Sequence, residues 1–375
     1  MSARFLTVVL ERAFNMRDGF GREIDYMRIS VIDSCNLNCY YCNPCDNNEH
    51  CHALNILSVK EVLCIVRAAT RLGIKHFRLT GGEPLLHPQL DEMVLQIKKI
   101  PGVSSVSLTT NAVLLAQHAK WLKEAGIDSI NVSLDTIDAS EYERITKKPL
   151  LEEVKHGINA AIECGIRVKI NVVLTPQTDV VALTRYVAKK GTDIRFIEMM
   201  PVGEGHTNGV EPYKKVIGTL SKLYGEPCRI NTEKTKEINS GNDKRKIPDN
   251  GPAEYYIFPE LGIRVGLIQA IHGKFCDTCN RIRVTADGRL MPCLGSSVTM
   301  DLVPDSCEFT DDLEKDFAIV QVLKAAIKAK PGCHNFNDNA VTYTKTTETK
   351  NTEIKTTELK AAEVNAARNM SRIGG

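Results

Sequence analysis

Short runs of β-type residues alternate with helical patterns from residue 26 onward. This alternation predicts repeated βα units around a parallel sheet. Ser58 and Glu61 have the spacing of a capping box and mark the start of the first predicted helix. The predicted strands are 26–33, 75–80, 103–110, 127–133, 166–173 and 193–199. The helices predicted after the first are 88–99, 114–125, 151–164 and 179–189.

The first five predicted strands are apolar on one face and polar on the other. In the first strand, Met27 and Ile29 alternate with Arg28 and Ser30, so the two sets project to opposite sides. If helices cover the outside of a barrel, the apolar faces contact the helices and the polar faces line the lumen. A lumen of this kind is a binding cavity rather than a filled core. A doubly wound sheet with polar strand ends is the alternative.

The pattern divides the chain into three parts. We predict a β/α barrel over residues 1–230, a C-terminal region over 231–336 and a flexible tail over 337–375. The tail is expected because Thr, Lys and Glu dominate residues 337–366 and large apolar residues are few there. Further β-type runs lie at 254–258 and 262–268.

Composition narrows the class of protein. The chain is 43% hydrophobic and 25% charged, and no apolar stretch approaches the roughly 20 residues of a membrane span. The apolar run 5–10 is shorter than the core of a secretory signal and is followed at once by Glu11 and Arg12. A net charge of +2 argues against a nucleic-acid surface. We therefore expect a cytoplasmic protein that binds neither membrane nor nucleic acid.

Cys35, Cys39 and Cys42 form a first triad directly after the first predicted strand, where barrel enzymes place their chemistry. In a reducing cytosol, spaced cysteines bind metal more often than they form disulfides. Three thiolates hold three irons of a 4Fe-4S cluster and leave the fourth iron open to S-adenosylmethionine (SAM). The alternatives are a zinc site and a ferredoxin-like carrier that uses Cys45 with the last two members. Otherwise Cys45 and Cys51 are loop thiols.

Cys276, Cys279 and Cys293 form a second triad. Structural zinc takes four ligands, so a set of three cysteines suits a cluster with a free iron that faces a substrate. His272 would complete a zinc site, and that alternative stays open.

Two short motifs accompany the triads. Arg281 and Arg283 are alternate residues and project to one side of an extended segment, which indicates an anionic or carbonyl-rich ligand. The run Gly81-Gly82-Glu83-Pro84 follows the second predicted strand. Its glycines permit close backbone approach to a ligand, and its backbone and carboxylate suit an ammonium group.

The sequence resembles the radical SAM enzymes through the first triad and the Gly-Gly-Glu-Pro turn. Within them it is similar to the family of GTP 3′,8-cyclases, which begin molybdenum cofactor biosynthesis. The second triad with its Arg-x-Arg and the terminal Gly374-Gly375 are the specific signals. The resemblance extends over nearly the whole chain and includes Asp18-Gly-Phe-Gly-Arg22, Thr109-Thr-Asn, Asn131-Val-Ser-Leu-Asp135 and Arg195-Phe-Ile-Glu. It implies an α/β fold, an incomplete (β/α)6-type TIM-like barrel of the radical SAM kind with a C-terminal iron-sulfur-binding extension.

The resemblance also implies cofactors and ligand contacts. The cofactors are SAM and two 4Fe-4S clusters, one on each triad. Gly374 and Gly375 would enter the site and assist turnover. The SAM contacts it implies are Tyr41, Gly82, Ser133 and Met200. The GTP contacts it implies are Arg28, Arg78, Thr109, Lys169, Arg281, Ile282 and Arg283.

In such an enzyme a 5′-deoxyadenosyl radical removes the ribose C3′ hydrogen of GTP, and the resulting carbon radical adds to guanine C8. The partners implied are a low-potential electron donor of the flavodoxin or ferredoxin type, the next enzyme of molybdopterin synthesis and a second copy in a homodimer. His76 stands where the family usually has a lysine, which weakens the expected phosphate clamp. Two alternatives remain: a radical SAM enzyme that modifies a peptide or another small molecule, and a non-enzymatic iron-sulfur or zinc protein.

Overall fold

The structure is a computed structural model of the chain, and it describes residues 16–42, 55–202, 209–230, 251–296, 298–302, 312–334 and 336. The expectations for Cys45 and Cys51, for the tail 337–375 and for Gly374 and Gly375 lie outside the described residues.

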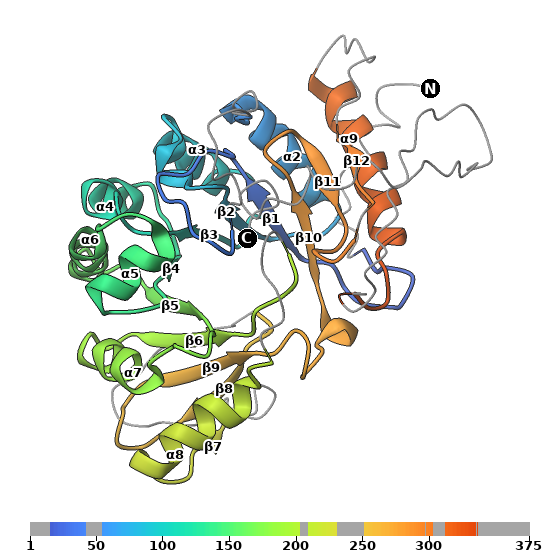
Figure 1. Ribbon diagram of the computed structural model, residues 1–375. Helices are drawn as coiled ribbons and strands as arrows, with labels where there is room; N and C mark the ends of the chain where they lie inside the picture. The colour runs from blue at the N-terminus through green and yellow to red at the C-terminus, as the bar shows by residue number, and fades with distance from the viewer. Residues whose placement is uncertain are drawn as a thin grey trace.

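A 12-stranded sheet organises the described chain, in the order β12-β11-β10-β1-β2-β3-β4-β5-β6-β9-β8-β7. The strands from β10 through β9 pair in parallel and curve around a common interior (Figure 1). The strands beyond them at each edge pair antiparallel. The bounds are β1 Tyr26–Ser30, β2 His76–Thr80, β3 Ser105–Thr110, β4 Ser129–Ser133, β5 Val168–Val173, β6 Asp193–Ile197, β7 Cys228–Arg229, β8 Glu254–Ile257, β9 Arg264–Ile268, β10 Arg281–Val284, β11 Arg289–Met291 and β12 Met300–Asp301.

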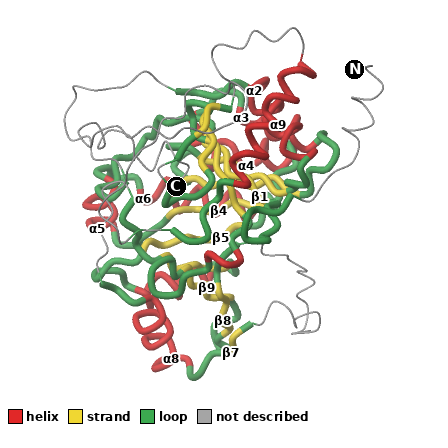
Figure 2. Tube along the Cα trace, turned by 90° about the vertical axis from the view of Figure 1, so that its right-hand side faces the viewer, coloured by secondary structure: helices red, strands yellow, loops and turns green. Residues whose placement is uncertain are grey.

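Helices lie along the outer side of the curved sheet (Figure 1), and Figure 2 shows the molecule turned by 90°. All the predicted strands and helices are confirmed, with shifts of a few residues at their ends. The capping box is confirmed as well, because Ser58 accepts a hydrogen bond from the Glu61 amide at 3.3 Å and Glu61 accepts one from the Ser58 amide at 2.8 Å. The α-helices are α2 Val59–Arg71, α3 Leu90–Lys98, α4 Leu115–Glu124, α5 Ala139–Thr146, α6 Leu151–Glu163, α7 Val180–Lys189, α8 Gly218–Tyr224 and α9 Asp312–Lys328. Shorter turns are the 3-10 helices η1 Pro84–Leu86 and η3 Cys276–Thr278 and the π-helix η2 Tyr213–Ile217.

Strands β1 to β6 neighbour one another in chain order. A doubly wound sheet would instead reverse its order at a switch point, so this alternative is wrong. The α/β class and the incomplete barrel with a C-terminal extension are confirmed.

Helix α5 was not predicted from the pattern. Asp138 caps it by accepting a hydrogen bond from the Glu141 amide at 2.8 Å, and Lys147 ends it in the left-handed conformation. The Asp138-x-x-Glu141 spacing is the signal that marks this short helix. Its position matters because the carbonyls of Ile145 and Thr146 accept hydrogen bonds from the loop that carries the first triad.

The C-terminal region extends the barrel at both edges. β9 pairs with β6 and β10 pairs with β1, both in parallel. Residues 269–280 connect β9 to β10, so this one segment joins the two edges of the parallel strands. The loops that carry the two triads are therefore connected to strands of the same curved sheet.

The apolar strand faces form the core against the helices, as predicted. Met27, Ile29, Phe77 and Leu79 are fully buried. In both views α9 lies beside α2 (Figures 1 and 2), where the buried Asp316 is paired with Arg67 at 3.2 Å and Arg71 at 3.3 Å. Over the ranges that the structure describes, no helix is both long and apolar enough to cross a membrane.

Candidate active site

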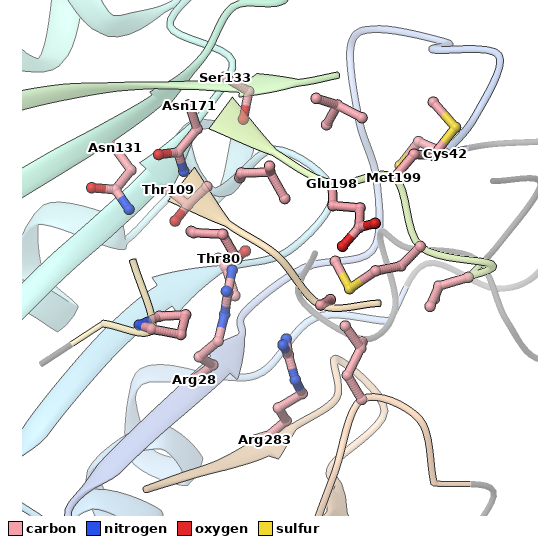
Figure 3. A pocket seen from close by; sticks show the side chains of 18 of the residues that line it. Arg28, Cys42, Thr80, Thr109, Asn131, Ser133, Asn171, Glu198, Met199 and Arg283 are labelled. Carbon is pink, nitrogen blue, oxygen red and sulfur yellow. The ribbon is translucent and has the colours of Figure 1, made fainter. Parts of the chain in front are cut away.

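A chamber of about 300 Å³ lies inside the curve of the sheet. Polar side chains of β1, β3, β4 and β5 enter it, as the strand pattern predicts, and Figure 3 shows Arg28, Thr109, Asn131, Ser133 and Asn171 among them. All six cysteines of the two triads line this same chamber. The residues of both predicted cluster sites therefore share one cavity.

The first triad lies on the loop after β1. This loop is held by backbone hydrogen bonds from Asn38 to Thr146 at 3.0 Å and from Tyr40 to Ile145 at 3.1 Å. At its start, Cys35 accepts weak hydrogen bonds from the Leu37 amide at 3.5 Å and the Asn111 side chain at 3.8 Å. The loop is thus fixed on α5 and on the end of β3.

Burial makes the Cys35 and Cys39 thiols poor acids. It raises the pKa of Cys35 to about 11, and the pKa of Cys39 rises further because Cys42 and Asp135 add negative charge nearby. Such thiols lose their protons when they ligate a metal, because the cation reverses the local electrostatics. The three-thiol donor set therefore fits an iron-sulfur cluster.

The second triad is built from two segments. Cys276 and Cys279 flank η3 just before β10, and Cys293 follows β11. Because β10 and β11 pair antiparallel, the end of β11 returns to the start of β10. Burial raises the pKa of Cys279, but Arg281 and Lys330 oppose this and lower it to about 7. A thiol in this setting readily becomes a metal-binding thiolate.

The triads stand at opposite ends of the parallel strands. The first follows the carboxyl end of β1, and Cys279 precedes the amino end of β10, which runs parallel to β1. Arg28 of β1 is in register with Arg283 on one side and with Arg78 on the other. These arginines form a row across three strands, and its members Arg28 and Arg283 line the chamber between the triads.

The arginine row has unfavourable electrostatics of its own. Burial, together with the like charges of Arg283, Arg78 and Arg281, lowers the pKa of Arg28 well below its usual value. Burial and Arg281 lower the pKa of Arg283 to about 10. Figure 3 shows Arg28 and Arg283 entering the chamber side by side. A polyanion bound here relieves this repulsion, so the row fits a phosphate-bearing ligand.

The remaining predicted GTP contacts are placed differently. Thr109 and Arg281 line the chamber, whereas Arg78, Lys169 and Ile282 are not among its lining residues. Arg78 donates hydrogen bonds to the hydroxyl of Tyr26 at 2.5 Å, the carbonyl of Leu108 at 3.0 Å and the hydroxyl of Thr109 at 3.4 Å. The ammonium of Lys169 lies 5.9 Å from the ring centroid of Tyr255. The side chain of Ile282 is fully buried in the core.

All four predicted SAM contacts, Tyr41, Gly82, Ser133 and Met200, line the chamber. Gly82 is required by close packing, because a Cβ there would lie 2.1 Å from the carbonyl oxygen of Ser34. The Tyr41 hydroxyl donates to Asp135 at 2.5 Å. The structure therefore brings these residues into one region beside the first triad.

Glu83, the carboxylate of the Gly-Gly-Glu-Pro turn, has a structural role. It is 1% exposed and accepts hydrogen bonds from the Leu85 amide at 3.0 Å, the Thr110 hydroxyl at 2.7 Å and the Asn111 amide at 2.7 Å. It is absent from the chamber lining. Glu83 thus joins the turn after β2 to the end of β3, and the backbone at Gly81 and Gly82 is what faces the chamber.

His272 is paired with Glu198. Its Nδ1 contacts one carboxylate oxygen of Glu198, and the second oxygen accepts from the amides of Ile271 at 2.7 Å and His272 at 3.1 Å. Within the described ranges, no group of three or more His, Cys, Asp and Glu side chains is arranged around one metal ion. His272 is also absent from the chamber lining, so the structure gives it no place in a zinc site with Cys276 and Cys279.

Sequence reasoning assigned no role to several residues of the chamber. The side-chain oxygens of Asn131 and Asn171 are buried in its wall (Figure 3), and within the part of the chain that the structure describes they have no hydrogen-bond partner. Their position on the polar strand faces was the available signal. Lys330 and His334 also line the chamber, and they lie in a segment that has no regular hydrophobic pattern.

Comparison with known proteins identifies the families that this chain matches. Residues 29–182 match the radical SAM superfamily, and residues 192–336 match the family described as Molybdenum Cofactor Synthesis C. The GTP 3′,8-cyclase of Clostridium perfringens strain SM101 is 36% identical over 324 residues, which cover 86% of this chain and 95% of that enzyme. The GTP 3′,8-cyclases of Pelotomaculum thermopropionicum and Listeria monocytogenes serovar 1/2a are each 36% identical, over 85% of this chain and over 95% and 92% of their own lengths.

Among solved structures, the chain is similar to Streptococcus suis SuiB bound to SAM. The TM-score is 0.53 at 15% sequence identity, and the match covers 80% of this chain and 65% of SuiB. At this identity the likeness shows a shared fold.

Proposed function

The chain belongs to the GTP 3′,8-cyclase family of the radical SAM superfamily, and we propose that the chamber between its two cysteine triads is where GTP is cyclised. It is a radical SAM enzyme of molybdenum cofactor biosynthesis, and its cofactors are a 4Fe-4S cluster and SAM. When bound, the reduced cluster and SAM would supply the radical chemistry that removes the C3′ hydrogen of GTP; C3′ would then bond to guanine C8, and an electron from a reductant with a proton would complete the cyclised product. The protein contributes ligands, orientation and electrostatics.

At one end of the chamber, Cys35, Cys39 and Cys42 hold the cluster that binds SAM. The lack of a side chain at Gly82 lets the backbone of Ser34 pack against it, and Gly82 itself lines the chamber. Ser133 and Met200 border the same region and complete the SAM contacts. The Tyr41–Asp135 hydrogen bond fixes the loop against β4 and β5, because the other carboxylate oxygen of Asp135 accepts from the Val173 amide at 2.7 Å.

In the middle of the chamber, Arg28 and Arg283 bind the triphosphate of GTP, together with Thr109 and Arg281. Charge-assisted hydrogen bonds from guanidinium groups to phosphate are strong and directional, so they fix the nucleotide along the strands. Arg78 supports this clamp through its bond to the Thr109 hydroxyl. Lys169 and the backbone at Ile282 complete the proposed GTP contacts.

At the other end, Cys276, Cys279 and Cys293 would hold a second 4Fe-4S cluster, which would have an iron free to bind the guanine. The observation that carries the proposal is that both triads line one cavity with the arginine row between them. This arrangement suits a ligand with an anionic end and a heterocyclic end.

The proposal extends to partners and location. A low-potential flavodoxin or ferredoxin reduces the first cluster, and the next enzyme of molybdopterin synthesis takes up the product. Both triads need reduced thiols, so we place the enzyme in the cytoplasm, where it acts as a homodimer. Gly374 and Gly375 enter the chamber and assist turnover.

The double variant Arg281→Ala/Arg283→Ala tests the assignment. It should abolish cyclisation of GTP and leave uncoupled cleavage of SAM largely intact, because the two arginines serve the substrate and not the first triad. Arg289→Ala on the adjacent β11 is the matched control, since its side chain is half exposed and paired with Asp287 and Asp301. Equal loss of both activities in the double variant would contradict this division of roles. SAM cleavage with a peptide altered in place of GTP would favour a peptide-modifying enzyme.

A further inference from the structure

Lys330 is a buried cation to which the proposed reaction assigns no role. It is 2% exposed, follows the end of α9 and lines the chamber beside the second triad. A buried ammonium is unfavourable unless hydrogen bonds and opposite charges compensate it. The partners of Lys330 therefore indicate why it is buried.

Those partners lie on the two segments that build the second triad. The Lys330 ammonium donates to the carbonyl of Arg281 at 2.8 Å and to the carbonyl of Pro292 at 2.8 Å. Arg281 comes two residues after Cys279, and Pro292 directly precedes Cys293. One side chain thus ties together the two chain segments whose separation sets the spacing of the cysteines.

Arg22 ties the remaining cysteine to the segment that carries Lys330. Arg22 is 8% exposed and is paired with Asp18 at 2.6 Å. Its guanidinium donates to the carbonyl of Cys276 at 2.6 Å and to the carbonyl of Pro331 at 2.6 Å. Hydrogen bonds from Lys330 and Arg22 to backbone carbonyls therefore connect the segment that begins at Lys330 to the chain around all three cysteines of the triad.

Lys330 also places positive charge beside the thiols. Burial lowers the pKa of Lys330, and the charges of Cys279 and Cys293 oppose this effect. The ammonium is therefore within electrostatic reach of both cysteines. A cluster becomes more negative when it is reduced, so a neighbouring cation favours the reduced state.

We propose that Lys330 is a positioning residue for the second triad, which fixes the spacing of Cys279 and Cys293 through two backbone carbonyls and raises the reduction potential of the cluster that they hold. It acts through the backbone and through charge and is not itself a ligand. The inference rests on the proposed function, in which the second triad binds a 4Fe-4S cluster.

The test compares Lys330→Met with Lys328→Met in the anaerobically reconstituted enzyme. Lys328 is exposed at the end of α9, so it is a matched control for the same change. The measurements are iron and sulfide content, the rate of iron loss to a chelator and the midpoint potential of each cluster by electron paramagnetic resonance. Lys330→Met should release the iron of one cluster about 10- to 100-fold faster. The potential of that cluster should fall, and the cluster on Cys35 should be unaffected.

Lys330→Arg should restore the potential in part, because it keeps the charge but not the length of the side chain. Equal iron release and equal potentials in Lys330→Met and Lys328→Met would overturn the proposal. In a Cys293→Ala background, Lys330→Met should change neither iron content nor iron release. A further loss there would show that Lys330 supports the fold in general, which also overturns the proposal. A wild-type protein that holds a single cluster would contradict the second cluster site itself, independently of any variant.

Discussion

Arg28 on β1 lies in register with Arg283 on β10, and both guanidinium groups enter the chamber (Figure 3). The contact joins the first strand of the barrel to a strand that follows it by more than 250 residues along the chain. Burial lowers the pKa of both groups; the charge of Arg283 lowers that of Arg28 further, and the charge of Arg281 lowers that of Arg283. Such a row of like charges does not stabilise the fold by itself, and it suits the binding of an anion.

Arg283→Met is therefore expected to weaken GTP binding by about 10- to 100-fold, the loss that corresponds to one charge-assisted contact of about 1.5–3 kcal/mol. Equilibrium binding of GTP to the reconstituted enzyme measures the change. Arg289→Met, on the neighbouring strand, should bind GTP as the wild type does. An unchanged affinity in Arg283→Met would remove the arginine row from the GTP site.

His76 is expected to contribute no charge to GTP binding at pH 7.5. Burial lowers its pKa below 6.5, although Asp25, 3.9 Å away, opposes this. The ring therefore gains its proton only under acidic conditions. His76→Gln should leave the KM for GTP within about twofold of the wild-type value at pH 7.5. A KM that rises severalfold in the variant at this pH would show that the histidine is charged in the enzyme.

Glu83 is expected to make stability depend on pH. Burial raises its pKa to about 7, whereas an unfolded glutamate titrates near 4.5. The unfolded chain then binds fewer protons than the folded chain between these values, so the stability from this residue is complete below pH 4.5 and is lost as the pH rises through 7. Calorimetry of wild type and Glu83→Gln should show a flatter pH dependence in the variant. Parallel curves would contradict the raised pKa.

Glu83→Ala tests the structural role of the same residue. It leaves buried donors at Leu85, Thr110 and Asn111 without their acceptor. Each unpaired buried donor costs about 1–3 kcal/mol, so the Tm should fall by several degrees. A Tm equal to that of the wild type would show that these donors find other partners.

Gly82→Ala is expected to disrupt the SAM end of the chamber. The added Cβ would lie 2.1 Å from the backbone oxygen of Ser34, which precedes the first triad. The loop must shift, so SAM cleavage should fall more than tenfold, since misplacement by about 1 Å is enough for such losses. Gly218→Ala at the start of α8 is the control, because a Cβ there meets nothing within 4 Å. Equal SAM cleavage in the two variants would place SAM elsewhere.

Asn131 and Asn171 are expected to bind ligand and not to stabilise the empty fold. Their side-chain oxygens have no hydrogen-bond partner among the described residues, so a bound donor such as a ribose hydroxyl would satisfy them. Asn131→Ala/Asn171→Ala should change the Tm of the ligand-free protein little and should reduce the rise in Tm that SAM or GTP produces. An undiminished rise with both ligands would exclude the pair from binding.

Most of the barrel could be predicted from local sequence patterns. The first five strands of the barrel were predictable because they alternate apolar and polar residues, and α2 because Ser58 and Glu61 cap it. The pairing of β9 with β6 and of β10 with β1 could not be predicted, because nothing local in Arg264 to Ile268 or Arg281 to Val284 specifies a partner strand. These pairings bring the second triad into the barrel.

Some residues of the candidate site could likewise be predicted from the sequence and others could not. Both triads could be found from their spacing, and Arg28 from its place on a polar strand face. Lys330 could not, because its partners Arg281 and Pro292 are backbone carbonyls 49 and 38 residues away. Contacts of this kind leave no side-chain signature in the sequence.

The most direct test of the chamber uses GTP deuterated at the ribose C3′. If the first triad, the arginine row and the second triad hold the nucleotide as proposed, the deuterium should appear in the 5′-deoxyadenosine that the reconstituted enzyme forms. Formation of 5′-deoxyadenosine without transfer of the label from C3′ would contradict the proposed placement of GTP.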